Sequence, residues 1–351
     1  EIGSEPLNFS KFPVLGIATT YSASNYITCS SAAGTALSTG YKTNNGMLGV
    51  LPDSTNLQSI TYRLHDAGYK IGIMTTVTID HATPGAFYAN SVARSDYYGI
   101  ANQLSKTGFE FFGGGGFYDP LGENDGEKSA YTTTEEAGYT ITYGLDDFNA
   151  KKAANTKFLM LQERGKEDNI LPYAFERGEN DLTLSQVVNA AIEVLDNEKG
   201  FFMMAEGGKI DWAAHSNDLP NTIFETIDMA DAIEVAYQFY LKHPKQTLII
   251  VTADHETGGI SVGRGKGYSL YLNHVDSIKA QKSDVSIATY MNDKTALDSL
   301  SIVSKIGWTT TSHTGGGVPV YAIGAHSDLF AGRMDNTEIP HKICDAMGVK
   351  F

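Results

Sequence analysis

The sequence predicts an α/β protein with three layers, in which helices cover both faces of a largely parallel central sheet. Two observations support this fold class. Short apolar runs rich in β-branched and aromatic residues alternate along the chain with longer segments of helical periodicity. The chain has 351 residues, of which 42% are hydrophobic, and it can therefore fill a large core.

Five apolar runs are predicted strands, and we expect each to be buried on both faces, as parallel strands between two helical layers are. In chain order they are residues 70–76, 157–161, 201–206, 247–253 and 318–324. The four glycines at 113–116 are not followed by Gly-Lys-Ser/Thr, so they indicate a turn at a strand end rather than a phosphate loop.

Helical periodicity is clearest in residues 220–242, where apolar residues recur every three or four positions. A second helix is predicted in residues 184–200, with Gly200 as its C-terminal stop. Residues 117–139 and 258–311 interrupt the alternation. We therefore expect a single domain over residues 1–351, with 258–311 as an insertion in it.

The net charge of −15 argues against binding to nucleic acid or to anionic lipid. No apolar run reaches the roughly 18 to 20 residues of a membrane span. The first residues show no signal-peptide pattern, and Glu1 is not a start methionine, so we expect a processed chain or a fragment. Two cysteines make no disulfide framework, and they leave the redox compartment open.

Acidic residues and histidines gather beside three of the predicted strands, where ligands bind in open α/β sheets. These residues are Glu206, Asp211, His215, Asp254, His255 and His313. Imidazole with carboxylate and no thiolate suits zinc in an open catalytic site, and harder oxygen ligands suit magnesium. Each histidine alone is more simply a structural or surface residue, but their joint placement predicts a metal centre.

The segment "ITCSSAAGTALSTGYKT" at residues 27–43 is made of small residues. It can place a serine in the first turn of a helix, where the backbone N–H groups and the helix dipole favour an anion. The alternative is a serine N-cap before a packed alanine-rich helix. The neighbouring metal centre favours the anion site.

His81, Thr83 and Arg94 form a further candidate group. A helix that begins near Thr83 and runs about three turns would deliver the Arg94 guanidinium from its far side. A guanidinium can bind one phosphate group through two parallel hydrogen bonds, although a lone helical arginine is more often a solvated surface residue.

Five motifs follow one another in a fixed order: "TCSSAAGTALSTGYKTNNG", "HATPGAFYANSVAR", "EGGKIDWAAHSN", "VTADHETGG" and "SHTGGG". In this order they resemble the alkaline phosphatase family over essentially the whole chain. The resemblance implies a phosphomonoesterase with two zinc ions and one magnesium ion, a phosphoserine intermediate and a crown-like insertion near the mouth of the site at 258–311. It also suggests a homodimer in the periplasm or outside the cell.

The resemblance also implies a role for each matching residue. Ser30, twelve residues before Lys42, would be the nucleophile rather than Ser31, and Arg94 would clamp the phosphate oxygens. The implied metal ligands are Asp211, His215 and His313 for the first zinc, Asp254 and His255 for the second, and Thr83 and Glu206 for magnesium.

Three departures from the family pattern carry expectations. Cys29 replaces an aspartate expected to restrain Arg94, so we expect Arg94 to be less tethered and product phosphate to bind more weakly. His81 and Trp212 occupy variable positions beside the substrate, and His81 could draw zinc into the third site. Residues 1–28 contain no aspartate to match the one after the family's first strand. The chain shown is therefore expected to begin after that strand and to bind the second and third metals poorly.

Three other readings stay open at this point. Arylsulfatases, nucleotide pyrophosphatases and cofactor-independent phosphoglycerate mutases share parts of this metal arrangement, although Ser30 disfavours the sulfatases unless Cys29 is the nucleophile. A protein that binds phosphate or metal without turnover is a second reading. A metal-free serine hydrolase is the third, and the absence of a G-x-S-x-G elbow disfavours it.

Overall fold

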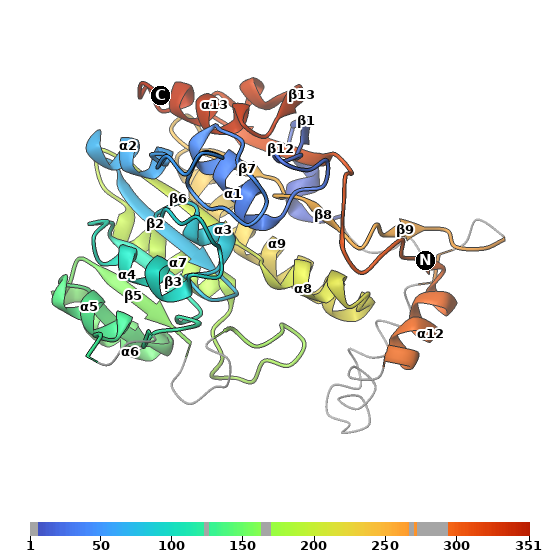
Figure 1. The fold of residues 1–351 in the computed structure, drawn as a ribbon, viewed down its shortest axis with the longest axis horizontal. Coiled ribbons are helices and arrows are strands. Elements are labelled where there is room, and N and C mark those ends of the chain that lie inside the picture. Colours follow the sequence, from blue (N-terminus) through green and yellow to red (C-terminus); the bar gives the residue numbers. More distant parts are fainter. Residues whose placement is uncertain (1–5, 123–125, 163–169, 267–269, 272–293) are drawn as a thin grey trace.

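A parallel five-stranded sheet forms the centre of the fold in the computed structural model, which describes residues 6–122, 126–162, 170–266, 270–271 and 294–351 (Figure 1). The strand order is β4-β5-β3-β2-β6, and all neighbours are parallel. The strands are β2 (Lys70–Thr75), β3 (Phe111–Gly114), β4 (Thr140–Tyr143), β5 (Phe158–Leu161) and β6 (Phe201–Glu206). The predicted α/β fold class is confirmed.

A second sheet of four strands, in the order β13-β1-β12-β7, mixes parallel and antiparallel pairs. Its strands are β1 (Val14–Thr19), β7 (Leu248–Val251), β12 (Val318–Gly324) and β13 (Gly332–Asp335). Two ladders of two residues per strand complete the strands: β8 (Glu256–Thr257) with β11 (His313–Thr314), and β9 (Ser261–Val262) with β10 (Ile306–Gly307).

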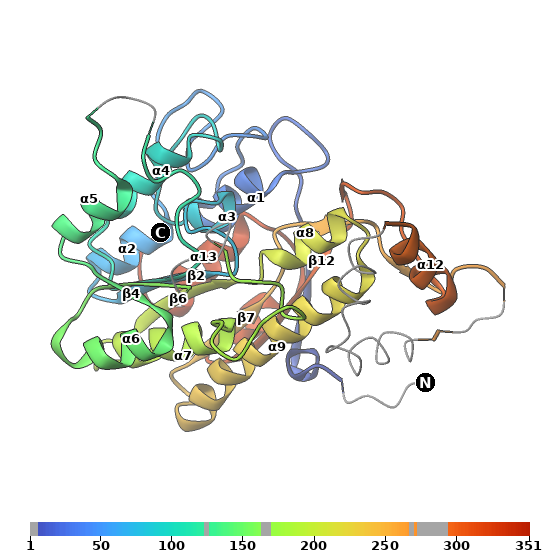
Figure 2. The same ribbon diagram turned by 90° about the horizontal axis from the view of Figure 1, so that it is seen from below.

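Helices cover both faces of the five-stranded sheet because its strands present apolar side chains alternately to each face. On one face, Ile73 and Phe112 pack with residues of α2, α4 and α5. On the other, Met74 and Phe111 pack with residues of α6, α7 and α9, of which α7 and α9 lie side by side (Figure 2).

The helices have the following bounds: α1 (Ser30–Thr39), α2 (Ile60–Asp66), α3 (Ala82–Gly85), α4 (Tyr97–Leu104), α5 (Ala130–Glu136), α6 (Gly144–Lys151), α7 (Leu184–Leu195), α8 (Lys209–His215), α9 (Leu219–Lys242), α12 (Lys294–Ser304) and α13 (Glu338–Ala346). Short 3-10 helices occupy η1 (Asn8–Lys11), η2 (Lys152–Ala154) and η4 (Ser327–Phe330). A membrane span would need a longer apolar helix than any in the described part of the chain.

Local sequence explains the two long helices. Thr183 and Gln186 form a capping box at the start of α7, each side chain bonding to the other residue's backbone N–H. Asp218 caps α9 through the backbone N–H of Asn221. The expected stop at Gly200 is wrong, because α7 ends at Leu195 and Gly200 lies, with φ of 101°, in the turn before β6.

The expectation that every predicted strand is buried on both faces holds for β5 and for all but the first residue of β2. It is wrong for β6 and β7, whose residues are all half-buried, because each pairs with a single neighbouring strand in the described sheets. It is also wrong for β12, where Pro319 is exposed. An antiparallel sheet tolerates solvent on one face.

The segment expected to be an insertion holds β9, β10 and α12 among its described residues, while 267–269 and 272–293 lie outside them. Its two ends meet at a backbone crossing. Gly258 donates its N–H to the Ser312 carbonyl at 3.0 Å and accepts N–H groups from Thr309 and Thr310 at 2.9 and 3.1 Å. The ladder of β8 and β11 lies directly beside this crossing.

Candidate active site

Helix α8 carries two of the predicted metal ligands. It begins shortly after the carboxyl end of β6, and its residues Asp211 and His215 stand four positions apart on one face. His215 Nε2 lies 3.4 Å from Asp211 Oδ1. The strand-end placement predicted for these residues is therefore what the fold provides.

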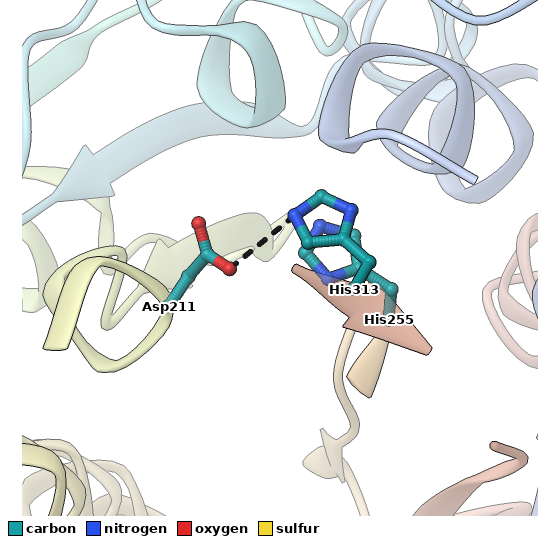
Figure 3. A group of neighbouring side chains, drawn as sticks. All are labelled: Asp211, His255 and His313. Carbon is teal, nitrogen blue, oxygen red and sulfur yellow. Dashed lines mark ion pairs between the residues drawn. The ribbon is translucent and has the colours of Figure 1, made fainter. Parts of the chain in front are cut away.

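The β8–β11 ladder brings two more histidines to the same place. His255 directly precedes β8, and His313 opens β11 and pairs with Thr257. The rings of His255 and His313 stack with centroids 3.6 Å apart, facing Asp211 (Figure 3). Ligand atoms of Asp211, His255 and His313 all lie within 4.8 Å of one another.

Backbone carbonyls fix the tautomers of two histidines. His215 Nδ1 lies 2.7 Å from the Thr311 carbonyl oxygen, and His313 Nδ1 lies 2.8 Å from that of Thr28. Because a carbonyl can only accept, each Nδ1 carries a proton, and in the neutral ring Nε2 is then the atom that presents a lone pair to a metal ion. The two Nε2 atoms are nevertheless 3.1 Å apart. Lone pairs that converge in this way, next to the Asp211 carboxylate, call for a cation between them.

The triangle formed by these three ligand atoms has the size of a zinc site. Its edges are 3.1 Å between the two Nε2 atoms, 3.4 Å from His215 to Asp211 Oδ1, and 3.5 Å from His313 to Asp211 Oδ1. A tetrahedral zinc ion with bonds of about 2.0–2.1 Å sets its ligand atoms roughly 3.3 Å apart. Two imidazoles and a carboxylate are also a ligand set of catalytic zinc.

The surroundings of Asp211 keep its carboxylate charged. Burial alone would raise its pKa, but contact with His313, the charge of the His255 ring and a hydrogen bond from Thr257 lower that pKa to about 2. The Thr257 hydroxyl donates to Asp211 Oδ1 at 2.6 Å. A deprotonated carboxylate is the form that binds metal.

His255 directs its Nε2 atom to a second group of polar atoms. Nε2 lies 3.1 Å from Asp254 Oδ2 and 3.1 Å from Ser30 Oγ. Nδ1 lies 3.2 Å from the Thr257 oxygen, which accepts here because its proton goes to Asp211. Burial lowers the pKa of His255, yet the carboxylates of Asp254 and Asp211 outweigh burial and raise it to about 9. Positive charge is thus favoured at this point.

Ser30 is the serine that faces this second group. It is the first residue of α1, with a 6% exposed fraction, and Cys29 precedes it as the N-cap. Ser31 is fully buried, and its Oγ lies 3.2 Å from Cys29 Sγ. Of the two serines, Ser30 is the one whose Oγ contacts His255, so the geometry favours Ser30 over Ser31 as the nucleophile.

Cys29 lies in a polar environment beside Ser30. Its Sγ accepts the backbone N–H of Gly46 at 3.2 Å. Burial would raise the pKa of the thiol, but hydrogen bonds from Ser31 and from backbone N–H groups, with a smaller effect of the Arg94 charge, lower it overall.

The prediction that a three-turn helix carries Arg94 is wrong. Helix α3 ends at Gly85, and the chain then forms a two-way backbone pair between Leu48 and Ser91, at 2.9 and 2.8 Å, in place of helical hydrogen bonds. Arg94 follows in a loop, where its N–H donates to the Gly46 carbonyl at 2.7 Å.

Arg94, His81 and Trp212 lie together, and a loop rather than a helix carries the arginine. Arg94 Nη2 lies 3.3 Å from His81 Nε2, and the His81 ring meets the Trp212 ring edge-on at 5.8 Å. Burial and the Arg94 charge lower the pKa of His81 to about 4, against the opposing carboxylates of Asp211 and Asp254. A neutral His81 therefore accepts a hydrogen bond from Arg94.

Glu206 and Thr83 form the last predicted group. The Thr75 hydroxyl donates to Glu206 Oε2 at 2.5 Å, and the Thr83 side chain also hydrogen bonds to this carboxylate. Burial, with a smaller contribution from the carboxylates of Asp254 and Asp211, raises the pKa of Glu206 to about 7. A carboxylate with hydroxyl neighbours is an oxygen-rich setting that suits magnesium.

Two residues of the site escaped the sequence prediction. Thr257 stands two positions after His255, and strand periodicity could have placed both on one face. Thr75 is opposite Glu206 in the parallel pairing of β2 and β6. Only the strand order, which the sequence does not contain, brings those two residues together.

Comparisons with known proteins point to a single family. The family profile described as "Alkaline phosphatase" matches residues 2–110 and 118–349. Alkaline phosphatase 3 of Bacillus subtilis is 30% identical over 98% of this chain and 82% of its own length, and alkaline phosphatase 4 of the same organism is 32% identical over 89% and 75%.

Solved structures give the same result. The cold-active alkaline phosphatase of Shewanella sp. has a TM-score of 0.84 at 30% identity, over 99% of this chain and 94% of that one. The alkaline phosphatase of the Antarctic bacterium TAB5 has a TM-score of 0.81 at 32% identity, over 100% and 92%. This chain belongs to the alkaline phosphatase family, and it is a metal-dependent enzyme that hydrolyses phosphate monoesters.

Proposed function

We propose that phosphate monoesters are hydrolysed through a phosphoserine at Ser30, with two zinc ions and one magnesium ion as cofactors. Residues 1–28 offer no aspartate to complete the ligands of the second zinc ion and of magnesium, so we expect the chain shown to bind these two metals more weakly than the first zinc ion. Asp211, His215 and His313 would hold the first zinc ion, Asp254 and His255 the second, and Thr83 and Glu206 the magnesium ion. A solved variant of the TAB5 alkaline phosphatase has magnesium bound.

One observation carries the proposal. The Nε2 lone pairs of His215 and His313 converge with Asp211 Oδ1 in a triangle whose edges of 3.1 to 3.5 Å fit a tetrahedral zinc ion. The second group, around His255 Nε2, includes Ser30 Oγ at 3.1 Å. The nucleophile thus lies at the edge of the proposed metal centre.

The reaction proceeds in two displacements at phosphorus. Ser30 Oγ bonds to phosphorus as the ester P–O bond breaks and the alcohol leaves; water then attacks phosphorus, releasing inorganic phosphate and restoring the serine hydroxyl. When bound, the metal ions supply Lewis-acid stabilisation of the attacking and leaving oxygens. Two inversions give overall retention of configuration.

Residues of this chain hold the substrate for attack. The Arg94 guanidinium, steadied by neutral His81 at 3.3 Å, binds two phosphate oxygens. The first turn of α1 adds backbone N–H groups and the positive end of its dipole beside Ser30. Trp212 borders the substrate from the side of His81.

Acid quenching during turnover tests the serine assignment. Zinc- and magnesium-loaded enzyme is mixed with p-nitrophenyl phosphate, stopped in acid and digested, and the peptide that contains residues 30 and 31 is sequenced by mass spectrometry. We expect one phosphoryl group on Ser30, which Ser30→Ala abolishes and Ser31→Ala retains. Phosphate on Ser31, or turnover by Ser30→Ala, contradicts the assignment.

The wider assembly forms a second part of the proposal. We infer a single domain over residues 1–351 with a crown-like insertion at 258–311, and a homodimer in the periplasm or outside the cell. Leu15 and Ile17, 56% and 54% exposed on β1, offer apolar surface for such a dimer. Light scattering after size exclusion gives the mass directly, and a monomer at micromolar concentration contradicts the dimer.

A further inference from the structure

Lys209, the first residue of α8, has a fully buried side chain, with an exposed fraction of 1%. Its Nζ donates to the Leu171 carbonyl at 2.8 Å and lies 3.6 Å from the centre of the Tyr173 ring. Its backbone N–H donates to Thr76 Oγ1, just past β2, at 3.3 Å. Removing an ammonium group from water is costly, and an apolar side chain would fill the same space at lower cost.

Leu171 and Tyr173, which contact the Lys209 side chain, belong to a segment that we call the strap, residues 170–182. The strap contacts α8 through Lys209 and α9 through Glu225. The strap is fixed at one end by the Leu171 N–H, which donates to the Thr76 carbonyl at 3.1 Å. Further along, the Ala174 N–H donates to Glu225 on α9 at 2.6 Å. Lys209 is therefore tied to two elements that are themselves fixed.

A second pair ties the strap to α9. Arg177 and Asp228 form a two-point ion pair in which both side chains are almost fully buried. Lys209 and this ion pair thus hold the same strap on two different helices. Of these two contacts, that of Lys209 is made by the helix that carries Asp211 and His215.

The geometry of α8 explains why such a contact matters. This helix has seven residues, follows Gly207 and Gly208, and has no side-chain hydrogen bond at its N-cap. Its own sequence therefore does little to fix its position. Asp211 stands two residues after Lys209, about 200° around the helix axis. A contact that fixes Lys209 on the inner side therefore fixes the direction of Asp211 on the outer side.

We propose that Lys209 is a positioning residue for the metal centre. Its buried ammonium ties the first turn of α8 to the strap, while its backbone N–H bonds to Thr76 just past β2, so that Asp211 Oδ1 meets the Nε2 atoms of His215 and His313. This inference rests on the proposed role of Asp211 as a zinc ligand.

Zinc affinity, measured by competition with a chromogenic chelator on the full chain, tests this role without relying on turnover. Lys209→Met keeps the length of the side chain and removes its charge. We expect it to weaken zinc binding by about tenfold or more, as other changes that release a metal ligand do. Lys209→Arg, which keeps a cation with N–H donors, restores most of that affinity.

The matched control is the double variant Arg177→Met with Asp228→Leu, which loosens the strap on α9 and removes both charges of the ion pair. It lowers the unfolding temperature of the metal-free protein, and its zinc affinity stays within twofold of wild type. Zinc binding by Lys209→Met within twofold of wild type overturns the proposal. Equal weakening by the control also overturns it, because the strap as a whole would then be responsible.

Two further variants cover the cases in which Lys209→Met does not fold or the zinc assignment itself is wrong. If Lys209→Met does not fold, Tyr173→Leu removes the ring beneath the ammonium, and a several-fold loss of zinc affinity is expected; unchanged affinity refutes the role of Lys209. Asp211→Asn separates the two proposals. If it binds zinc as wild type does, the zinc assignment fails and the role of Lys209 falls with it.

Discussion

The hydroxyl of Thr257 joins the two groups of proposed metal ligands, and replacing it should weaken zinc binding. This hydroxyl donates to Asp211 Oδ1 at 2.6 Å and accepts from His255 Nδ1 at 3.2 Å. It therefore orients a ligand of the first zinc ion and fixes the tautomer of a ligand of the second. Thr257→Val keeps the β-branched shape that suits strand β8 and removes only the hydroxyl.

The size of the effect follows from these two contacts. A hydrogen bond to a charged carboxylate contributes about 1.5–3 kcal/mol, and 1.4 kcal/mol corresponds to a factor of ten. Some of that energy stabilises the metal-free protein as well, so the loss of zinc-binding free energy is smaller than the full energy of the hydrogen bond. We expect a decrease of about ten- to a hundredfold, the range found when a partner of a metal ligand is removed.

Competition with a chromogenic chelator measures the affinity, and near-UV circular dichroism checks that the variant is folded. The control is Thr314→Val on the facing strand β11. Thr314 follows His313 in the chain, and its hydroxyl makes the same kind of hydrogen bond within the same ladder, but to the carboxylate of Glu256, which is not a proposed ligand. Its zinc affinity is expected to stay within twofold of wild type.

Two results would refute this reasoning. If Thr257→Val binds zinc as tightly as wild type, the hydroxyl does not organise the ligands. If Thr314→Val loses as much affinity as Thr257→Val, the ladder matters only as a scaffold.

Three other predictions concern pH, phosphate and the fold. The pKa of about 7 for Glu206 means that magnesium must displace a proton below pH 7 and none well above it. Magnesium affinity should therefore fall about fivefold from pH 7 to 6 in calorimetry and level off above pH 8; a flat profile contradicts this. Cys29→Asp places a carboxylate near Arg94 and should lower the inhibition constant of phosphate several-fold; an unchanged constant means that Arg94 needs no such tether. Gly114→Ala would set a methyl group 1.7 Å from a carbonyl oxygen of β2, at a residue with φ of 123°, and should abolish folding. The control is Gly138→Ala, at a residue with φ of 87° and no atom within 4 Å of the new methyl group. It should lower the free energy of unfolding in urea by about 1 kcal/mol.

Apolar runs long enough to be recognised were predicted well. Strands β6 and β12 have the predicted bounds, and α9 begins within one residue of its predicted start. Strands β1 and β3 were missed for physical reasons. In β1 the side chains of Leu15 and Ile17 are exposed, and half of β3 is glycine, which by itself favours a turn.

In the candidate site, too, some residues were predicted from the sequence and others were missed. Residues that follow predicted strands, such as Asp211 and His255, were found because ligand-binding side chains gather just past strand ends. The parallel sheet supplies the strand before Asp211, whereas β7, the strand before His255, belongs to the mixed sheet. The route of the chain to Arg94 was not found, since it depends on the pairing of Leu48 with Ser91 rather than on helix periodicity. The buried Lys209 carries no signal in the sequence, where a lysine at a helix start usually lies in solvent.

The backbone crossing at Gly258 affects which parts of such enzymes can change during evolution. Both ends of the segment from Gly259 to Thr309 are joined by backbone hydrogen bonds next to the ladder that sets His313, so the ends stay in place whatever lies between them. Doubling the length of a flexible loop costs only about 0.6 kcal/mol in closure entropy. Natural selection, or an engineer, can therefore exchange this segment for one of another length and recognition chemistry while the hydrolytic centre keeps its register.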